Sequence, residues 1–157
     1  MGESRVFTRA AGEFFRVTKE IEFDTGHRVP LHESKCRNPH GHRYKVKANV
    51  VGPLKSAGSE SGMVVDFGYI KRLLTTDVHD RFDHAFVVQA SDTDLCNFLL
   101  DSDWNVVVVD FPPTAENMAA DIYGCLADKV AAMGQDVFLE SIEVYETPTS
   151  VAVYPVR

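Results

Sequence analysis

The sequence predicts an α+β fold, a two-layer sandwich in which helices gather on one face of an antiparallel sheet. Three features predict it: two long alternating segments near the N-terminus, two segments with helical periodicity, and a pair of strands at the C-terminus. Strands that pair with their neighbours in sequence, with helices on one side, are typical of this class. A chain of 157 residues is long enough for one domain with a substantial core.

The first two predicted strands are the clearest elements. In Phe15–His27 apolar residues alternate with polar ones and only Lys19 breaks the pattern, which is typical of a half-buried antiparallel strand. His42–Val51 repeats the alternation, and the loop of about a dozen residues between them is long enough to be functional. Residues 1–13 mix charged and small residues and are interpreted as a flexible leader, which leaves a single domain over residues 14–157.

Two helices are predicted from apolar residues that recur at helical spacing. Asp66 is a suitable N-cap for the first helix, which ends near Arg81, and Thr114, after two prolines, caps the second. Gly134 lies where a residue that ends the second helix is expected. Four further strands are predicted at Met63–Val65, Val106–Val109, Val137–Thr147 and Ser150–Val156.

The composition excludes several classes of protein. The chain has 16 Lys and Arg against 23 Asp and Glu, a net charge of −7, which argues against a nucleic-acid binder. No apolar segment approaches the ~20 residues that a membrane span needs. Three cysteines are too few, and odd in number, for a disulfide scaffold, so we expect a cytoplasmic protein.

The charge is uneven along the chain. Between Arg28 and Lys47 there are six Lys and Arg residues and a single acidic residue, Glu33. This cationic segment indicates either a local site for an anionic small molecule or a solvated strand face with a basic loop.

Three histidines are placed to meet. His27 ends the first strand, His42 begins the second on its buried face, and His40 lies two residues earlier on the same face. If the strands pair as a hairpin, the three imidazoles converge, and three imidazoles with an open position are how catalytic zinc is held. The alternative is a chance arrangement of unrelated histidines. Cys36, four residues before His40, is either a fourth ligand or a thiol that acts near the metal as base or nucleophile.

Further polar residues are candidates for acid–base chemistry. Asp83 and His84 follow the first helix, and a carboxylate beside an imidazole suits a proton relay because it fixes the tautomer. His79 with Asp80 is a rival pair, and His32 has no assigned role.

A carboxylate on the last long strand has two interpretations. Glu146 follows Ile142 and Val144 on one strand face, so it should point into the apolar layer, where it needs a partner. Either an arginine or backbone donors satisfy it, or it binds a ligand that presents paired N–H donors. Glu116 lies at the start of the second helix, where the positive end of the helix dipole stabilises its negative charge.

Together these residues resemble the 6-pyruvoyl/6-carboxy-tetrahydropterin synthase family. The matching pieces run in family order from about Phe15 to Arg157: Phe23-Asp24-Thr25-Gly26-His27, Cys36 with His40-Gly41-His42, Phe82-Asp83-His84, Pro113-Thr114-Ala115-Glu116-Asn117, and Tyr145-Glu146-Thr147. The resemblance implies the tunnelling fold, a four-stranded antiparallel sheet with two helices on one side. It also implies homo-oligomers, commonly hexamers, in which the sheets join into a β-barrel with active sites between subunits.

The activity implied by the resemblance is that of a zinc-dependent carbon–carbon lyase. Such an enzyme converts 7,8-dihydroneopterin triphosphate to 6-carboxy-5,6,7,8-tetrahydropterin, with release of acetaldehyde and triphosphate, in the 7-deazaguanine (queuosine precursor) pathway. By resemblance, the metal ligands are His27, His40 and His42, the base is Cys36, the relay is Asp83 with His84, the anchor of the pterin edge is Glu146, and the neighbours in that pocket are Thr114 and Glu116.

Two other functions remain open: elimination of triphosphate by a 6-pyruvoyl-tetrahydropterin synthase, and metal or pterin binding by a non-catalytic relative. The three-residue gap between Cys36 and His40 resembles the bacterial carboxy type, since animal pyruvoyl enzymes have a longer gap. Two departures concern selectivity for the substrate side chain. Val87-Val88 replaces a Leu-Asn pair of the short bacterial enzymes, and Gln89–Phe111 is longer than in the smallest members.

Overall fold

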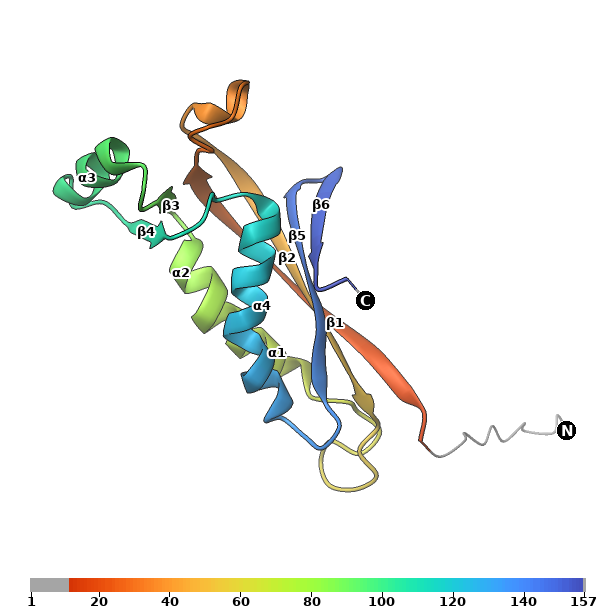
Figure 1. Cartoon of the computed structure of the whole chain (residues 1–157). Helices are drawn as coiled ribbons and strands as arrows, with labels where there is room; N and C mark the ends of the chain where they lie inside the picture. The colour runs from red at the N-terminus through yellow and green to blue at the C-terminus, as the bar shows by residue number, and fades with distance from the viewer. Residues whose placement is uncertain (1–11, 157) are drawn as a thin grey trace, which may run out of the picture.

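The computed structural model describes residues 12–156, so the predicted leader at residues 1–13 lies almost entirely outside the described residues. The described chain forms a curled six-stranded sheet in the order β4-β3-β1-β2-β5-β6, with α1 and α4 packed along one face (Figure 1). The α+β class predicted from the sequence is confirmed.

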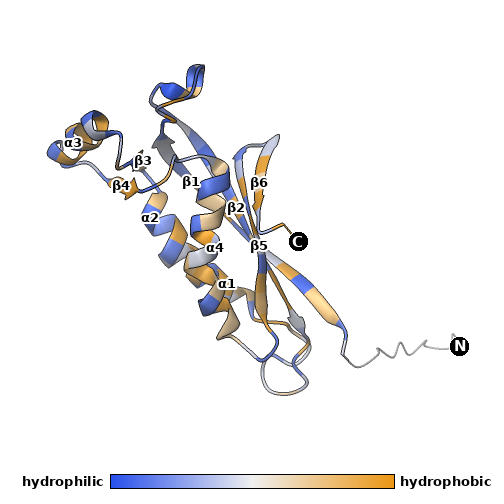
Figure 2. Cartoon of the chain, in the orientation of Figure 1, coloured by the Kyte–Doolittle hydropathy of each residue, from blue (hydrophilic) through white to orange (hydrophobic). Residues whose placement is uncertain are grey.

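Four of the strands form the antiparallel part of the sheet. They are β1 (Phe14–His27), β2 (His40–Pro53), β5 (Phe138–Thr147) and β6 (Ser150–Tyr154). The pairing of β1 with β2 is continuous from Phe14 opposite Pro53 to His27 opposite His40. Polar and apolar residues alternate along β1, as the sequence pattern predicted (Figure 2). The register fixes which residues of β1 and β2 share a face.

The sheet is mixed and six-stranded, so the four-stranded antiparallel sheet implied by the resemblance is wrong. β3 (Ala85–Gln89) runs parallel to the end of β1, and β4 (Val106–Val109) runs parallel to β3. Parallel neighbours need a crossover, which α3 (Thr93–Asp101) supplies. The joining of sheets into a barrel concerns assembly and stays a prediction.

The helices begin where their N-caps predict. Asp66 accepts a hydrogen bond from the Gly68 backbone N–H at 2.6 Å, and Thr114 accepts one from Asn117 N–H at 3.4 Å. The first helix consists of α1 (Phe67–Leu74), a π-helical turn (Thr75–His79) and α2 (Asp80–Phe82), and the second is α4 (Ala115–Ala131).

Two local predictions are wrong. Residues 63–65 form an irregular bend rather than a strand, although Val64 and Val65 are buried, because the chain enters the core there without a partner strand. Helix α4 ends at Ala131 with Ala132 as its C-cap. Gly134 lies two residues after this C-cap, so it is not the residue that ends the helix.

The core lies between the helices and the inner face of the sheet. Its large, fully buried side chains include Tyr44, Phe82, Ile70, Leu74, Met118, Ile122, Leu126, Leu139 and Ile142. Among the described residues, no helix is both long and apolar enough to cross a membrane.

One partly buried ion pair fixes the α3 segment to the end of β1. Arg28 donates to both carboxylate oxygens of Asp92 at 2.5 Å, and the Asp92 side chain is only 7% exposed. We expect Asp92→Asn to lower the free energy of unfolding by about 1–3 kcal/mol, because the guanidinium loses a bidentate partner. Urea denaturation measures the loss. Asp110→Asn, at an exposed position, is the control, and equal stability of the two variants would contradict the prediction.

Candidate active site

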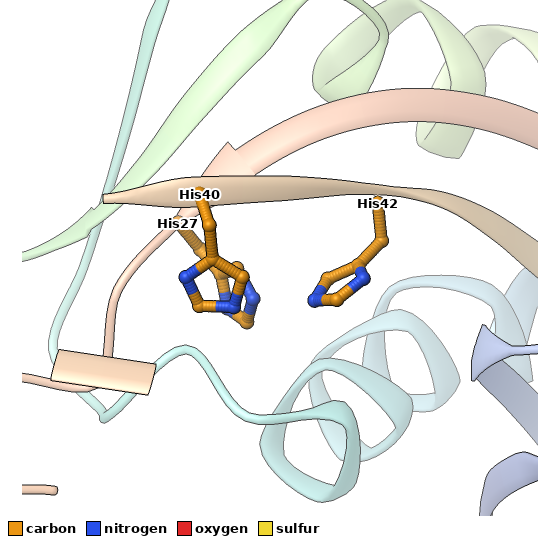
Figure 3. A group of neighbouring side chains, drawn as sticks. All are labelled: His27, His40 and His42. Carbon is orange, nitrogen blue, oxygen red and sulfur yellow. The ribbon is translucent and has the colours of Figure 1, made fainter. Parts of the chain in front are cut away.

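Three imidazoles meet at the end of the β1–β2 hairpin. His27 pairs with His40 in the strand register, and His42 follows on the same face, so the rings lie on one side of the strands (Figure 3). One nitrogen from each ring lies within 4.8 Å of the others. The convergence predicted from strand alternation is present in the structure.

Backbone carbonyls orient two of these rings. Nδ1 of His27 donates to the Pro113 carbonyl at 2.7 Å, and Nδ1 of His40 donates to the Asn38 carbonyl at 2.7 Å. A neutral imidazole that donates from Nδ1 keeps its lone pair on Nε2. Bonds of this kind orient metal-binding histidines in proteins.

The surroundings of His42 and His27 also fit a bound cation. Nε2 of His42 is buried and has no hydrogen-bond partner among the described residues, although a buried polar atom is normally satisfied. Burial, more than any other cause, lowers the pKa of His27, and the nearby His40 and His42 lower it further. A neutral imidazole is the form that binds metal. The cluster therefore fits a divalent cation held by three nitrogens.

A tyrosine and a carboxylate lie beside the cluster. The Tyr44 hydroxyl donates to Oε1 of Glu146 at 3.2 Å, and the same Oε1 lies 3.5 Å from Nε2 of His27 and 3.8 Å from Nε2 of His42. Burial, with Glu146, raises the pKa of Tyr44, so its hydroxyl stays a donor. Among the residues that the structure describes, the hydrogen-bond partner of Glu146 is thus Tyr44, and neither an arginine nor a backbone donor. Sequence reasoning missed Tyr44, although it lies on the same strand face as His42.

A cavity of about 250 Å³ opens beside the imidazoles and gathers most of the candidate residues. Its lining includes His27, His32, Cys36, Thr114, Glu116 and Glu146. Cys36 comes from a 3-10 turn (Lys35–Arg37), and its carbonyl accepts a hydrogen bond from Val29 N–H at 2.8 Å. This cavity combines one imidazole of the cluster, a thiol and two carboxylates. His32, to which the sequence assigned no role, also lines it.

The structure does not bring Asp83 and His84 to that cavity. Oδ1 of Asp83 accepts from Asp24 N–H at 3.1 Å, and Oδ2 accepts from Nδ1 of His84 at 2.8 Å. The Asp24 N–H lowers the pKa of Asp83 most, and His84 contributes next. His84 has a φ of 55°, in the left-handed region that is uncommon for residues other than glycine. The Asp83 carboxylate therefore orients the ring of a residue whose backbone conformation is itself unusual.

His84 instead lines a separate cavity of about 700 Å³, whose lining includes Gly26, Gly41 and Trp104. The lining of this cavity also includes His42, so one member of the histidine cluster borders it. The two cavities have no lining residue in common. Within one chain, Asp83 and His84 therefore form a second group of candidate residues, outside the cavity that Cys36 and Glu146 line.

The alternative pair considered from the sequence, His79 with Asp80, lies beside Asp83. Nδ1 of His79 lies 3.2 Å from Oδ1 of Asp80, and its Nε2 lies 3.8 Å from Oδ2 of Asp83. Both pairs considered from the sequence thus meet at the carboxylate of Asp83.

Most of the cationic segment is already partnered. Four of its side chains contact acceptors: Arg28 contacts Asp92, Arg43 contacts Asp24, Lys45 contacts Glu22, and Lys47 contacts the Tyr145 hydroxyl. Lys35 and Arg37, on either side of Cys36, have no ion pair among the described residues. The cations available to an anionic ligand are therefore concentrated at the loop that carries Cys36.

Comparison with known proteins identifies relatives over nearly the whole chain. A family model described as 6-pyruvoyl tetrahydropterin synthase matches residues 16–156. A 6-carboxy-5,6,7,8-tetrahydropterin synthase from Haemophilus influenzae is 32% identical over 143 residues, which cover 89% of this chain and 98% of the relative. A protein of the same name from Synechocystis sp. is 34% identical over 139 residues, with coverage of 88% and 91%.

Solved structures share the fold. An uncharacterized protein from Wolinella succinogenes is 25% identical and aligns with a TM-score of 0.74 over 93% of this chain and 100% of its own. The 6-pyruvoyl tetrahydropterin synthase of Caenorhabditis elegans is 24% identical and aligns with a TM-score of 0.65, over 92% of this chain and 97% of its own.

Proposed function

Because the chain belongs to the 6-pyruvoyl tetrahydropterin synthase family, we propose that it converts 7,8-dihydroneopterin triphosphate and water to 6-carboxy-5,6,7,8-tetrahydropterin, acetaldehyde and triphosphate, a step toward 7-deazaguanines. The observation that carries the proposal is a cavity lined by the Cys36 thiol, the Glu146 carboxylate and His27, a member of the three-histidine cluster. A zinc-dependent carbon–carbon lyase needs a cation site, a base and an anchor for its substrate, and these side chains supply all three.

The cation is proposed to be zinc, held by Nε2 of His27, His40 and His42. Three imidazoles that leave a position open are typical of catalytic zinc. When bound, zinc supplies a Lewis acid that polarises hydroxyl or carbonyl oxygens of the substrate side chain.

Two side chains of the cavity have proposed roles toward the substrate. Cys36 removes the proton from the carbon that carries a side-chain hydroxyl, as a thiolate can near neutral pH. Glu146 accepts hydrogen bonds from the N–H edge of the pterin, while the Tyr44 hydroxyl orients its carboxylate by donating to Oε1. Thr114 and Glu116 line the same cavity at the start of α4 and complete the pterin pocket.

The second group of residues is proposed to act in a neighbouring copy of the chain. Asp83 and His84 lie away from the cavity of their own chain, and His84 is exposed at 80% of its side chain. In a homo-oligomer, a hexamer by family resemblance, this imidazole reaches the cavity of the next subunit and returns protons to the substrate. Asp83, held by the Asp24 N–H, orients the imidazole and stabilises its protonated form.

The alternative product is that of a 6-pyruvoyl-tetrahydropterin synthase, which eliminates triphosphate and keeps the side chain. The names of the relatives at 32% and 34% identity favour the carboxy product. The three-residue gap between Cys36 and His40 favours it as well.

The Glu146 anchor gives a direct prediction. We expect Glu146→Gln to lower kcat/KM roughly 10- to 100-fold, because a neutral amide loses a charge-assisted pair of hydrogen bonds with the pterin edge. Steady-state kinetics and metal analysis of the same sample measure the effect. Glu143→Gln is the matched control, since Glu143 lies on the same strand but contacts Asn49. Unchanged kinetics in Glu146→Gln would contradict the anchor role.

The proposed activity is tested by the release of inorganic triphosphate from 7,8-dihydroneopterin triphosphate. The zinc-loaded protein is expected to release triphosphate with turnover, and the metal-depleted protein is expected to regain that activity when zinc is restored. A non-catalytic binding relative would bind the pterin and release nothing. No release by the zinc-loaded protein would contradict the proposal.

A further inference from the structure

His32 has a defined orientation in the cavity, and the family resemblance assigns it no role. It lies in the loop between β1 and β2, drawn in orange at the same end of the sheet as the start of α4 and the β5–β6 turn (Figure 1). We propose that His32 is a substrate-contacting residue that donates a hydrogen bond from Nε2 to a phosphate oxygen. This inference rests on the proposed function and identifies a residue that binds the phosphate end of the substrate.

The hydrogen bonding of the ring determines which nitrogen is the donor. The Ser34 backbone N–H donates to Nδ1 of His32 at 3.0 Å. A ring nitrogen that accepts a hydrogen bond carries no proton, so the proton of the neutral imidazole is on Nε2. Nε2 is therefore available as an N–H donor to a ligand in the cavity.

The loop that carries His32 is held in shape by its own backbone. His32 N–H donates to the Val29 carbonyl at 3.0 Å, Val29 N–H donates to the Cys36 carbonyl at 2.8 Å, and Arg37 N–H donates to the Ser34 carbonyl at 3.2 Å. His32 and Cys36 therefore belong to one ordered turn. A donor fixed in this way loses little conformational freedom when it binds a ligand.

The chemistry of the cavity differs between its two ends. The charged groups near α4 and β5 are carboxylates, Glu116 and Glu146, which accept hydrogen bonds and repel phosphate. At the loop end, Lys35 and Arg37 flank the lining residue Cys36 without lining the cavity themselves; they have no ion pair among the described residues, and Glu33 offsets one of their charges. We expect a ligand whose N–H edge lies on Glu146 to extend its far end toward this loop, because His32 and Cys36 of the loop line the same cavity. His32 is the lining side chain there that offers an N–H donor.

The experiment compares two oxidised ligands, neopterin and neopterin triphosphate, on the zinc-loaded protein. The ratio of their dissociation constants measures what the phosphates add to binding. We expect the ratio to exceed tenfold in the wild type, and to fall about five- to tenfold in His32→Phe, which keeps a ring but loses the donor. His32→Gln, which keeps an N–H donor, should restore the ratio to within about twofold of the wild type.

Two controls separate this inference from general effects of charge. Lys45→Gln removes a cation that is already paired with Glu22, and it should leave the ratio unchanged. Neopterin itself should bind His32→Phe as tightly as it binds the wild type. If neopterin binds the wild type but the ratio is the same in His32→Phe, the inference is wrong and the proposed function stands. If neither ligand binds the wild type, the proposed function and the inference are both wrong.

Discussion

Cys36→Ala is expected to bind zinc as the wild type does and to lose turnover by a factor on the order of 10³, within the range that removal of a general base produces. The side chain lines the cavity beside His27 and Glu146 but is absent from the group of converging ligand atoms. Its loss should therefore remove the base and leave the three nitrogen ligands intact. Steady-state turnover and zinc analysis of the same preparation measure the two effects separately.

A second thiol provides the control for Cys36→Ala. Cys125 is half-buried on α4 and lies outside the cavity, so Cys125→Ala should keep both zinc and turnover. If Cys36→Ala releases the zinc, the thiol is a fourth ligand, which is the alternative that the spacing before His40 left open. If it keeps full turnover, Cys36 is not the base.

His40→Ala is expected to abolish both zinc binding and turnover. His40 supplies one of the three converging nitrogens, and its ring is oriented by the Asn38 carbonyl. Two imidazoles alone hold zinc poorly, so the zinc content should fall from about one per chain to nearly none. Because zinc binds the folded state, its addition should raise the Tm of the wild type but not that of the variant.

His79→Ala is the matched control for His40→Ala, since His79 is an imidazole of the described chain that lies at Asp83 rather than in the cluster. It should keep its zinc. Full zinc content in His40→Ala would contradict the three-histidine site.

The hairpin and the histidine cluster could be predicted because both depend on strand alternation. A side-chain period of two places His40 and His42 on one face, and antiparallel pairing brings His27 opposite His40. The helix starts at Asp66 and Thr114 were predictable because capping is local chemistry.

The other parts of the fold depend on long-range packing. The parallel pairing of β3 with β1 joins Ala85 to Thr25 across the sequence, and no local pattern reveals such a partner. Helix α3 begins at Thr93 without a side-chain cap, so the signal at its start is weak. For Asp83 and His84, adjacency in sequence gives the contact between them but not their position outside the cavity that Cys36 and Glu146 line.

The identity of the product distinguishes the carboxy-type reaction from the alternatives. Zinc-loaded protein is incubated with 7,8-dihydroneopterin triphosphate, the pterins are identified by mass spectrometry, and acetaldehyde is assayed in parallel. We expect 6-carboxy-5,6,7,8-tetrahydropterin with an equal amount of acetaldehyde. A pyruvoyl pterin without acetaldehyde, or unchanged substrate in the presence of bound zinc, would contradict this expectation.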